Sequence, residues 1–304
     1  MARLDPRELY ELEPDLPALD APVLVQALDG FVDAGGAKRL ARTHLLARHG
    51  SRPVATFDVD ALLDYRARRP LMTFAEDHWE AYADPSLAIH LLEDAAGTPF
   101  LLLAGPEPDV HWEAFTSAVL QLVEHLGVRT TVGLNAIPMA VPHTRPLGVI
   151  AHATDPASIV GHERWVGTVQ VPSSAGHLLE FRLGQAGHDA AGFAVAVPHY
   201  LAEAEYPAAS ITLLQSVAGR TGLSFDLAEL ESGAETVRAQ VDETVSGSDE
   251  IRAVVEALER QYDAYLAGAG RSLLASMGGS LPSAEEIGDE LERFLAEQAE
   301  DGTP

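Results

Sequence analysis

The sequence contains no cysteine among its 304 residues. This absence excludes a disulfide framework, a thiolate metal site and a thiol nucleophile, and it suits a reducing compartment. The sequence also lacks any apolar run near the ~18 residues that a membrane span requires. Its first residues, MARLDPRELYELEPDLP, lack the basic and then apolar pattern of a signal peptide. We therefore expect a cytoplasmic protein that does not insert into membranes.

Basic side chains are scarce. The chain has 20 Lys and Arg against 46 Asp and Glu, which gives a formal charge of −26. Affinity for polyphosphates depends on basic side chains that neutralise phosphates, so nucleic acids and anionic membranes are not expected partners. Between residues 282 and 304 eight acidic residues accompany a single base, Arg293, and we expect this stretch to aid solubility.

The motifs of several enzyme classes are missing as well. The histidines form no H-E-x-x-H pattern, and no G-x-S-x-G marks a serine nucleophile. The glycines at 30, 35 and 36 fit neither a dinucleotide-binding nor a P-loop spacing. The sequence therefore predicts no catalytic residue, no metal site and no cofactor.

Apolar segments rich in Val, Leu and Ile alternate with segments of helical periodicity along the first two thirds of the chain. Strands are predicted at 22–28, 52–60, 86–94, 99–105, 129–137, 147–154 and 192–198, and helices at 37–50, 110–127 and 173–187. Strands without polar alternation are typical of a sheet that is covered on both faces. We therefore predict a three-layer α/β/α fold.

The composition changes after the last predicted strand. Three helical segments follow there without a strand between them, at 206–222, 225–248 and 249–268. We predict three parts of the chain, namely an α/β/α core at 1–206, a helical subdomain at 207–268, and a linker with an acidic C-terminal helix and tail at 269–304.

The last of these three helices carries an apolar stripe. Its members are Ile251, Val254, Val255, Leu258, Tyr262 and Leu266. Such a stripe must cover something apolar, either the α/β body or a second subunit. A homo-oligomer, in which a second subunit covers the stripe, is therefore one of the two explanations.

The segment LDGFVDAGG (28–36) joins the first predicted strand to the first long helix. A carboxylate at a helix N-terminus competes with phosphate for the free N–H groups, so Asp29 and Asp33 argue against an anion site. One interpretation is that Asp33 caps the helix while Gly35 and Gly36 let the backbone approach the sheet closely. The alternative is a site for a cationic or hydroxyl-bearing ligand, or for a divalent ion.

The segment NAIPMAVPHTRPLG (135–148) contains three prolines within nine residues, which makes this loop rigid although irregular. Arg145 could bind a carboxylate or phosphate with two hydrogen bonds, and His143 could exchange a proton near pH 7. The alternative is that these two side chains pair with Asp29 or Asp33 in a structural salt bridge, within one chain or between subunits.

Loops that follow the carboxyl ends of parallel strands lie along one edge of a sheet. The segments at 29–36, 105–109, 138–146 and 197–207 each follow a predicted strand, so we expect them to share a crevice that could hold a small ligand. The candidate ligand-binding residues are Asp29, Asp33, Asn135, His143, Arg145 and His199. We further expect a direct charge-assisted contact between Arg145 and the two aspartates.

Four segments together resemble the PAC2 family, the relatives of proteasome assembly chaperone 2, in its actinobacterial form. They are LDGFVDAGG, AIPMAVPHTRP, LLEFRLGQAGHDAAGFAVAVPHYLA and VVEALERQYDAYL. The resemblance extends from about Tyr10 to Leu266. It implies a phosphorylase/hydrolase-like α/β/α fold with a mixed sheet, and a homo-oligomer with a trimer favoured. Eukaryotic and archaeal relatives help to assemble 20S proteasome subunits, which makes proteasome subunits candidate protein partners.

Archaeal relatives that act on proteasomes end in a hydrophobic-Tyr-X motif, whereas this sequence ends in EDGTP, so we expect that docking element to be absent. Two classes of function remain. A non-catalytic assembly or chaperone-like protein, which we favour, would use its outer helices and apolar stripe. A small-molecule-binding protein, or a hydrolase- or phosphorylase-like enzyme, would use the crevice, by analogy with the fold alone.

Overall fold

The computed structural model of the chain describes residues 4–47, 51–159 and 168–267. One compact unit extends to Asp263, and a second unit begins at Ala264. The predicted linker and acidic tail at 269–304 lie outside the described residues. Every contact discussed below lies within the first unit.

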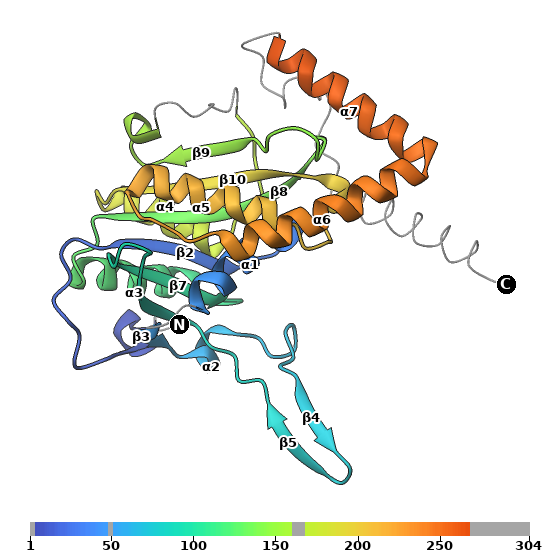
Figure 1. Cartoon of the computed structure of the whole chain (residues 1–304). Helices are drawn as coiled ribbons and strands as arrows, with labels where there is room; N and C mark the ends of the chain where they lie inside the picture. The colour runs from blue at the N-terminus through green and yellow to red at the C-terminus, as the bar shows by residue number, and fades with distance from the viewer. Residues whose placement is uncertain (1–3, 48–50, 160–167, 268–304) are drawn as a thin grey trace. The chain divides into compact units, whose positions relative to one another are not determined.

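An eight-stranded sheet forms the centre of this unit, with the strand order β1-β3-β6-β7-β2-β8-β10-β9 (Figure 1). Its strands are β1 (Tyr10–Leu12), β2 (Val23–Asp29), β3 (Arg52–Phe57), β6 (Ala88–Glu93), β7 (Pro99–Pro106), β8 (Thr130–Met139), β9 (Val149–Ala153) and β10 (Ala190–Pro198). The four central strands β7, β2, β8 and β10 pair in parallel, and the outer pairs are antiparallel. The mixed sheet that the family resemblance implies is confirmed.

Helices cover both faces of this sheet. The long helices are α1 (Ala37–Leu46), α3 (Trp112–His125), α4 (Ala175–Gln185), α5 (Pro207–Thr221), α6 (Ala228–Gly247) and α7 (Asp249–Ala267). On one face Val23 and Val25 of β2 pack in a buried cluster with α1 and α5. On the other face Leu24 and Leu28 pack with α3 and α4. Alternate side chains of one strand thus reach two separate cores, and the three-layer α/β/α fold is confirmed.

The helices α5, α6 and α7 follow one another without an intervening strand, as predicted. Helix α5 contributes Leu213, Leu214 and Val217 to the same buried cluster as α1, so this helix is part of the layer that covers the sheet. None of the described helices is long and apolar enough to cross a membrane.

The apolar stripe of α7 divides into a buried and an exposed half. The buried members are Val255, Leu258 and Tyr262, and the exposed members are Ile251, Val254 and Leu266. The Tyr262 hydroxyl donates a hydrogen bond to the Pro146 carbonyl at 2.9 Å, so the buried half faces the unit's own body.

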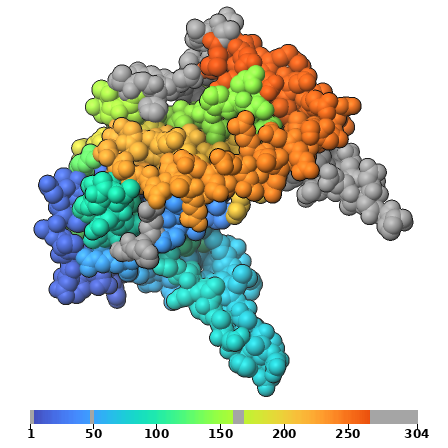
Figure 2. Space-filling view, in the orientation of Figure 1, coloured from blue at the N-terminus to red at the C-terminus, as the bar shows by residue number. Residues whose placement is uncertain are grey.

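A second, two-stranded sheet lies apart from the first. The strands β4 (Met72–Ala75) and β5 (His78–Tyr82) form an antiparallel hairpin between the short helix α2 (Val59–Leu62) and β6. This hairpin extends away from the main sheet (Figure 1, Figure 2). The sequence pattern predicts no strand in this segment.

The remaining short elements are 3-10 turns. They are η1 (Pro6–Leu9), η2 (Ala34–Gly36), η3 (Pro156–Ile159) and η4 (His199–Leu201). Turns η2 and η4 follow the carboxyl ends of β2 and β10, at the edge of the sheet where the sequence places the candidate site.

Candidate functional site

The loops singled out from the sequence leave the same edge of the sheet, because β2, β7, β8 and β10 are parallel. Two of these loops, at 29–36 and 138–146, carry four of the six candidate residues. We call Asp33–Gly36 the glycine turn and residues 142–146 the PHTRP loop. The contacts of each loop decide whether the candidate residues are free to bind a ligand.

Asp33 stabilises the first turn of α1. Its carboxylate accepts hydrogen bonds from the backbone N–H groups of Lys38 and Arg39, at 2.8 and 2.9 Å. Gly35 and Gly36 have left-handed backbone angles, with φ of 68° and 55°, which glycine adopts at little steric cost. The prediction that Asp33 caps this helix is confirmed.

The glycine turn packs against the segment that follows β10. The Gly35 N–H donates to the Ala202 carbonyl at 2.6 Å, and the Tyr206 N–H donates to the Gly35 carbonyl at 2.8 Å. A Cβ atom at Gly35 would lie only 2.8 Å from the Cβ of Tyr206. Two of the expected loops therefore meet, and the missing side chain at position 35 makes this approach possible.

Asp29, the last residue of β2, has a local partner. Its Oδ1 lies 2.6 Å from Nη1 of Arg42 on α1. Its backbone carbonyl accepts a hydrogen bond from the Glu107 N–H at 2.8 Å, which joins the carboxyl ends of β2 and β7. Asp29 and Asp33 thus both bind groups of α1 and help to hold this helix at the end of β2.

Arg145 makes its contacts with α7. Its Nε and Nη2 donate to Oδ1 and Oδ2 of Asp263, both at 2.8 Å, and Nη1 lies 3.3 Å from Oε1 of Glu259. The prediction that Arg145 contacts Asp29 or Asp33 is wrong. Glu259 and Asp263 are about one helical turn apart on α7, so they present two carboxylates together to one guanidinium.

Further hydrogen bonds join the same two elements. The Thr144 hydroxyl donates to Glu259, and the Tyr262 hydroxyl donates to the Pro146 carbonyl. We call these contacts between the PHTRP loop and α7 the loop–helix clamp. The hydrogen bonds from Arg145 also hold the pKa of Asp263 below its ordinary value, so the ion pair persists throughout the neutral pH range.

His143 is buried between two other elements, with only 3% of its side chain exposed. Its Nδ1 lies 2.7 Å from the Tyr200 hydroxyl, and its Nε2 lies 3.2 Å from Oδ1 of Asp242 on α6. The ring of His199 lies 5.4 Å from the ring of Tyr200, measured between centroids. Burial raises the pKa of Tyr200 to about 12, so its hydroxyl stays neutral near pH 7.

Asn135 is half-buried within β8, and its Oδ1 accepts a hydrogen bond from the Ala136 N–H at 2.9 Å. The six candidate residues therefore do not form one site. Asp29 and Asp33 contact α1, Arg145 contacts α7, and His143 and His199 lie beside Tyr200, while Asn135 bonds to its own strand. Within the described ranges no hydrogen bond or ion pair joins the two aspartates to the PHTRP loop.

A buried pair of charged residues that the sequence analysis missed lies at the same edge. Lys38 is 5% exposed and Glu107 is 6% exposed. A Cβ atom at Gly30 would lie 3.5 Å from both the Lys38 Nζ and the Glu107 Oε2. Glu107 also accepts a hydrogen bond from the Ala175 N–H at the start of α4. Burial lowers the pKa of Lys38 and raises the pKa of Glu107, so burial weakens the charged form of each.

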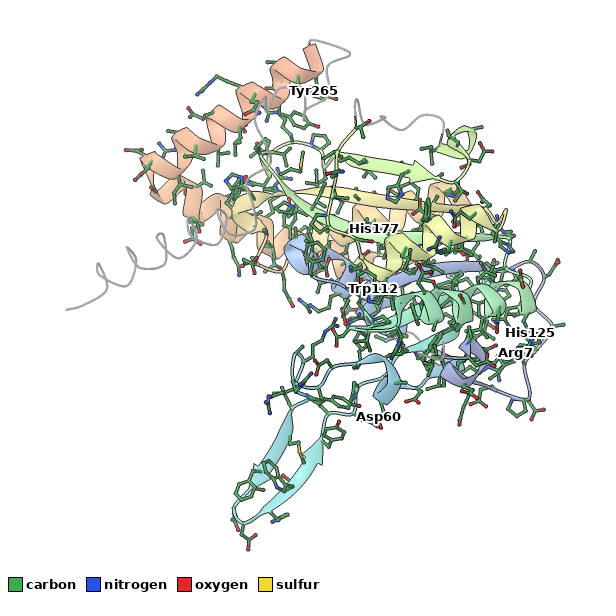
Figure 3. All side chains as sticks on the ribbon, turned by 180° about the vertical axis from the view of Figure 1, so that it is seen from behind. Arg7, Asp60, Trp112, His125, His177 and Tyr265 are labelled. Carbon is green, nitrogen blue, oxygen red and sulfur yellow. The ribbon has the colours of Figure 1, made fainter. Side chains whose placement is uncertain are left out.

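An open pocket of about 420 Å³ lies between β9 and α4. His152 contributes from β9, and its Nδ1 lies 2.8 Å from Oε1 of Glu180 on α4. His177 lies on the first turns of α4, where burial and the nearby His152 lower its pKa (Figure 3). In the part of the chain that the structure describes, no three His, Asp or Glu side chains are arranged to hold a metal ion.

Comparison with known proteins places the chain among relatives of the same fold. The PAC2 family model matches residues 27–245. A solved protein of unknown function from Mycobacterium tuberculosis is 51% identical, with a TM-score of 0.82, and the match covers 86% of this chain and 90% of that chain. No curated protein matches the sequence.

Two further solved structures are similar. A protein of unknown function from Corynebacterium glutamicum is 40% identical, with a TM-score of 0.83, and 86% of this chain and 100% of that chain are covered. A proteasome-assembly chaperone homologue from Mycobacterium tuberculosis is 29% identical, with a TM-score of 0.70 and coverage of 77% and 99%. The family match contains the glycine turn, the PHTRP loop and the Lys38–Glu107 pair. The chain therefore belongs to the PAC2 family.

Proposed function

We propose that this chain is a non-catalytic binding protein that acts in proteasome assembly, as a homo-oligomer in the cytoplasm. Family membership supports an assembly role, because a similar protein of 29% identity is described as a proteasome-assembly chaperone homologue. Proteasome subunits are accordingly the proposed partners.

The loop–helix clamp is the observation that carries the non-catalytic part of this proposal. Arg145 and His143 are the candidate residues best suited to bind or protonate an anionic substrate, yet they hydrogen-bond to acidic residues of α7 and α6. An anion would have to displace Asp263 from a two-point contact with the guanidinium. These contacts favour a structural role for the PHTRP loop, which leaves the outer surface for protein partners.

The charge of the chain favours one kind of partner surface. With a net charge of −26, the protein attracts basic surfaces and repels acidic ones. Salt screens such attraction between exposed charges, so the proposed complex should weaken as the ionic strength rises.

The experiment is a reconstitution with separately purified actinobacterial proteasome α and β subunits, followed by native mass spectrometry. We expect a complex with unassembled subunits, and a changed rate of 20S particle formation when the chain is added. The assembled 20S particle and an unrelated protein of similar acidity serve as controls. Absence of any complex, together with an unchanged assembly rate, would contradict the proposal.

The Lys38–Glu107 pair favours a second candidate, a small-molecule site at the same edge. A buried lysine and a buried glutamate with shifted pKa values are common at functional sites, although structural networks shift pKa values too. Thermal melts with nucleosides, amino acids and phosphate distinguish the two candidates. A ligand-dependent rise in melting temperature that is lost in Lys38→Met would support this second function, and an unchanged melting temperature would count against it.

A further inference from the structure

The open pocket between β9 and α4 has the dimensions of a small-molecule site. Its volume is about 420 Å³, within the roughly 300–1,000 Å³ that is usual for ligand-binding clefts. His152 and Ala153 line it from β9, and His177, Glu180 and Phe181 line it from α4. Side chains of two elements therefore surround one hollow beside the helix.

Gly192 of β10 makes room for the polar wall of this pocket. The register of the sheet pairs Gly192 directly with His152. A Cβ atom at Gly192 would overlap with Cε1 of His152, and it would lie 2.7 Å from Nε2 of the same ring and 3.1 Å from Oε2 of Glu180. The missing side chain therefore lets the imidazole and the carboxylate lie together against the sheet.

Nitrogen atoms of both histidines are available as hydrogen-bond acceptors. Nδ1 of His152 lies 2.8 Å from Oε1 of Glu180, and a carboxylate partner places the proton of a neutral ring on Nδ1. Nε2 then carries a lone pair, and among the described residues it makes no hydrogen bond. Burial lowers the pKa of His177, with His152 and Lys38 adding to the shift and Glu180 opposing it, so this ring is neutral near pH 7.

The fixed charge on the pocket wall is negative. Among the described residues that line the pocket, Glu180 is the sole Asp, Glu, Lys or Arg, and its side chain is 19% exposed. The cations nearby are already balanced, because Arg182 binds Glu113 through two N–H groups and Lys38 lies near three carboxylates. A ligand cation would therefore be attracted to this pocket, whereas an anion would meet the Glu180 carboxylate.

Phe181 gives the pocket an apolar wall beside this charge. Its side chain is 57% exposed although it lines the pocket. Planar rings pack well on aromatic side chains, and cations are attracted to the face of an aromatic ring. The guanidinium carbon of Arg182 already lies 5.5 Å from the centroid of this ring, so a planar cation is compatible with it.

We propose that this pocket binds a small organic cation with a planar ring, of the class of aromatic amidines and amines. The cationic N–H groups donate to Glu180 and to Nε2 of His152, while the ring packs on Phe181. The inference goes beyond the proposed function, because it needs no proteasome subunit. It also uses neither member of the Lys38–Glu107 pair.

Three probes of nearly the same shape separate the effect of charge from that of size. They are benzamidine, a cation, benzamide, which is neutral, and benzoate, an anion. Calorimetric titration of the full-length chain at neutral pH measures the affinity, and NMR spectra of the histidine rings report the contact. We expect benzamidine to bind about tenfold more tightly than benzamide and to shift the His152 and His177 signals, with benzoate not bound.

Substitutions locate the binding. Glu180→Gln should weaken benzamidine binding about tenfold, and Phe181→Ser should weaken it as well. Glu124→Gln is the matched control, since Glu124 lies 3.6 Å from Nε2 of His188 in a similar contact outside this pocket, and its affinity should equal that of the wild type. Circular dichroism checks that each variant is folded.

Three results would overturn the proposal: no binding of benzamidine, equal affinity for benzamidine and benzamide, or an unchanged affinity in a folded Glu180→Gln. The comparison of probes on the wild type decides the question even if a variant does not fold. A failure to bind proteasome subunits would leave the proposal intact and would contradict only the proposed function.

Discussion

Replacement of Gly35 by alanine tests whether the glycine turn packs closely against the segment that follows β10. Gly35 has a left-handed φ of 68°, and a Cβ there would lie 2.8 Å from the Tyr206 Cβ. Both neighbouring peptide groups are fixed, because the Gly35 N–H and carbonyl bond to Ala202 and Tyr206. The segment after β10 must therefore shift if a side chain is added.

The magnitude has two parts. A left-handed backbone costs an alanine about 1 to 2 kcal/mol relative to glycine. Forcing a methyl group into a packed contact costs about 1 to 3 kcal/mol more, and part of this is offset because alanine restricts the unfolded chain. We expect Gly35→Ala to lower the free energy of unfolding by about 2 to 4 kcal/mol.

Urea unfolding followed by circular dichroism measures this loss. Gly97→Ala is the matched control, since Gly97 also has a left-handed φ, 84°, but no atom lies within 4 Å of the added Cβ. It should lose only about 1 kcal/mol from backbone strain. If Gly35→Ala were no less stable than Gly97→Ala, the close approach between the glycine turn and the segment after β10 would not exist as described.

Three further predictions concern single contacts. Asp33→Ala should lose about 1 kcal/mol of stability in the same assay because two α1 amides lose their acceptor, whereas Asp33→Asn should keep most of it. Tyr262→Phe should lose about 1 kcal/mol with the hydrogen bond to Pro146, and an unchanged stability would remove this bond from the clamp. Burial raises the Glu107 pKa, so above its ordinary value of 4.5 the folded chain retains a proton that the unfolded chain has lost. The Glu107 carboxyl therefore contributes fully to stability below pH 4.5, and this contribution is lost as the pH rises through the pKa of the folded chain. In Glu107→Gln the urea midpoint should depend less on pH in this range. An unaltered pH dependence would contradict a raised pKa at Glu107.

The sequence predicts the layers of the fold and the cap at Asp33 because both depend on local pattern. Apolar strands that alternate with helical segments require a doubly covered sheet. Asp33 stands shortly before the start of a predicted helix, where aspartate commonly accepts hydrogen bonds from the first free N–H groups, and capping was one of the two interpretations of this turn. These features need no knowledge of how distant segments meet.

The partner of Arg145 could not be predicted in this way. Its carboxylates, Glu259 and Asp263, lie more than one hundred residues away on α7. The sequence shows several acidic residues that could serve, and only the packing of α7 beside the PHTRP loop decides among them. The pattern indicated the right chemistry, a guanidinium bound by carboxylates, with the wrong aspartates.

Lys38 and the hairpin were missed for different reasons. A lysine in a helix is usually solvated, but Lys38 precedes the buried residues Ala41 and Leu45 by three and seven positions, and this spacing was an available signal. The hairpin segment, LMTFAEDHWEAY, mixes apolar and acidic residues and contains a bulge that interrupts strict alternation. Neither residue composition nor periodicity indicates two strands there.

We propose that the polar groups of the PHTRP loop hold α7 in place and that this contact takes the place of a ligand. Hydrogen exchange at residues 255–263, compared between the wild type and Arg145→Met, tests it most directly. Arg182→Met is the control, because Arg182 forms a similar two-point ion pair with Glu113 elsewhere on the surface. We expect faster exchange at 255–263 in Arg145→Met alone, with the sheet and α5 unchanged. Unchanged exchange at 255–263, together with loss of binding to phosphate or a nucleotide, would contradict it.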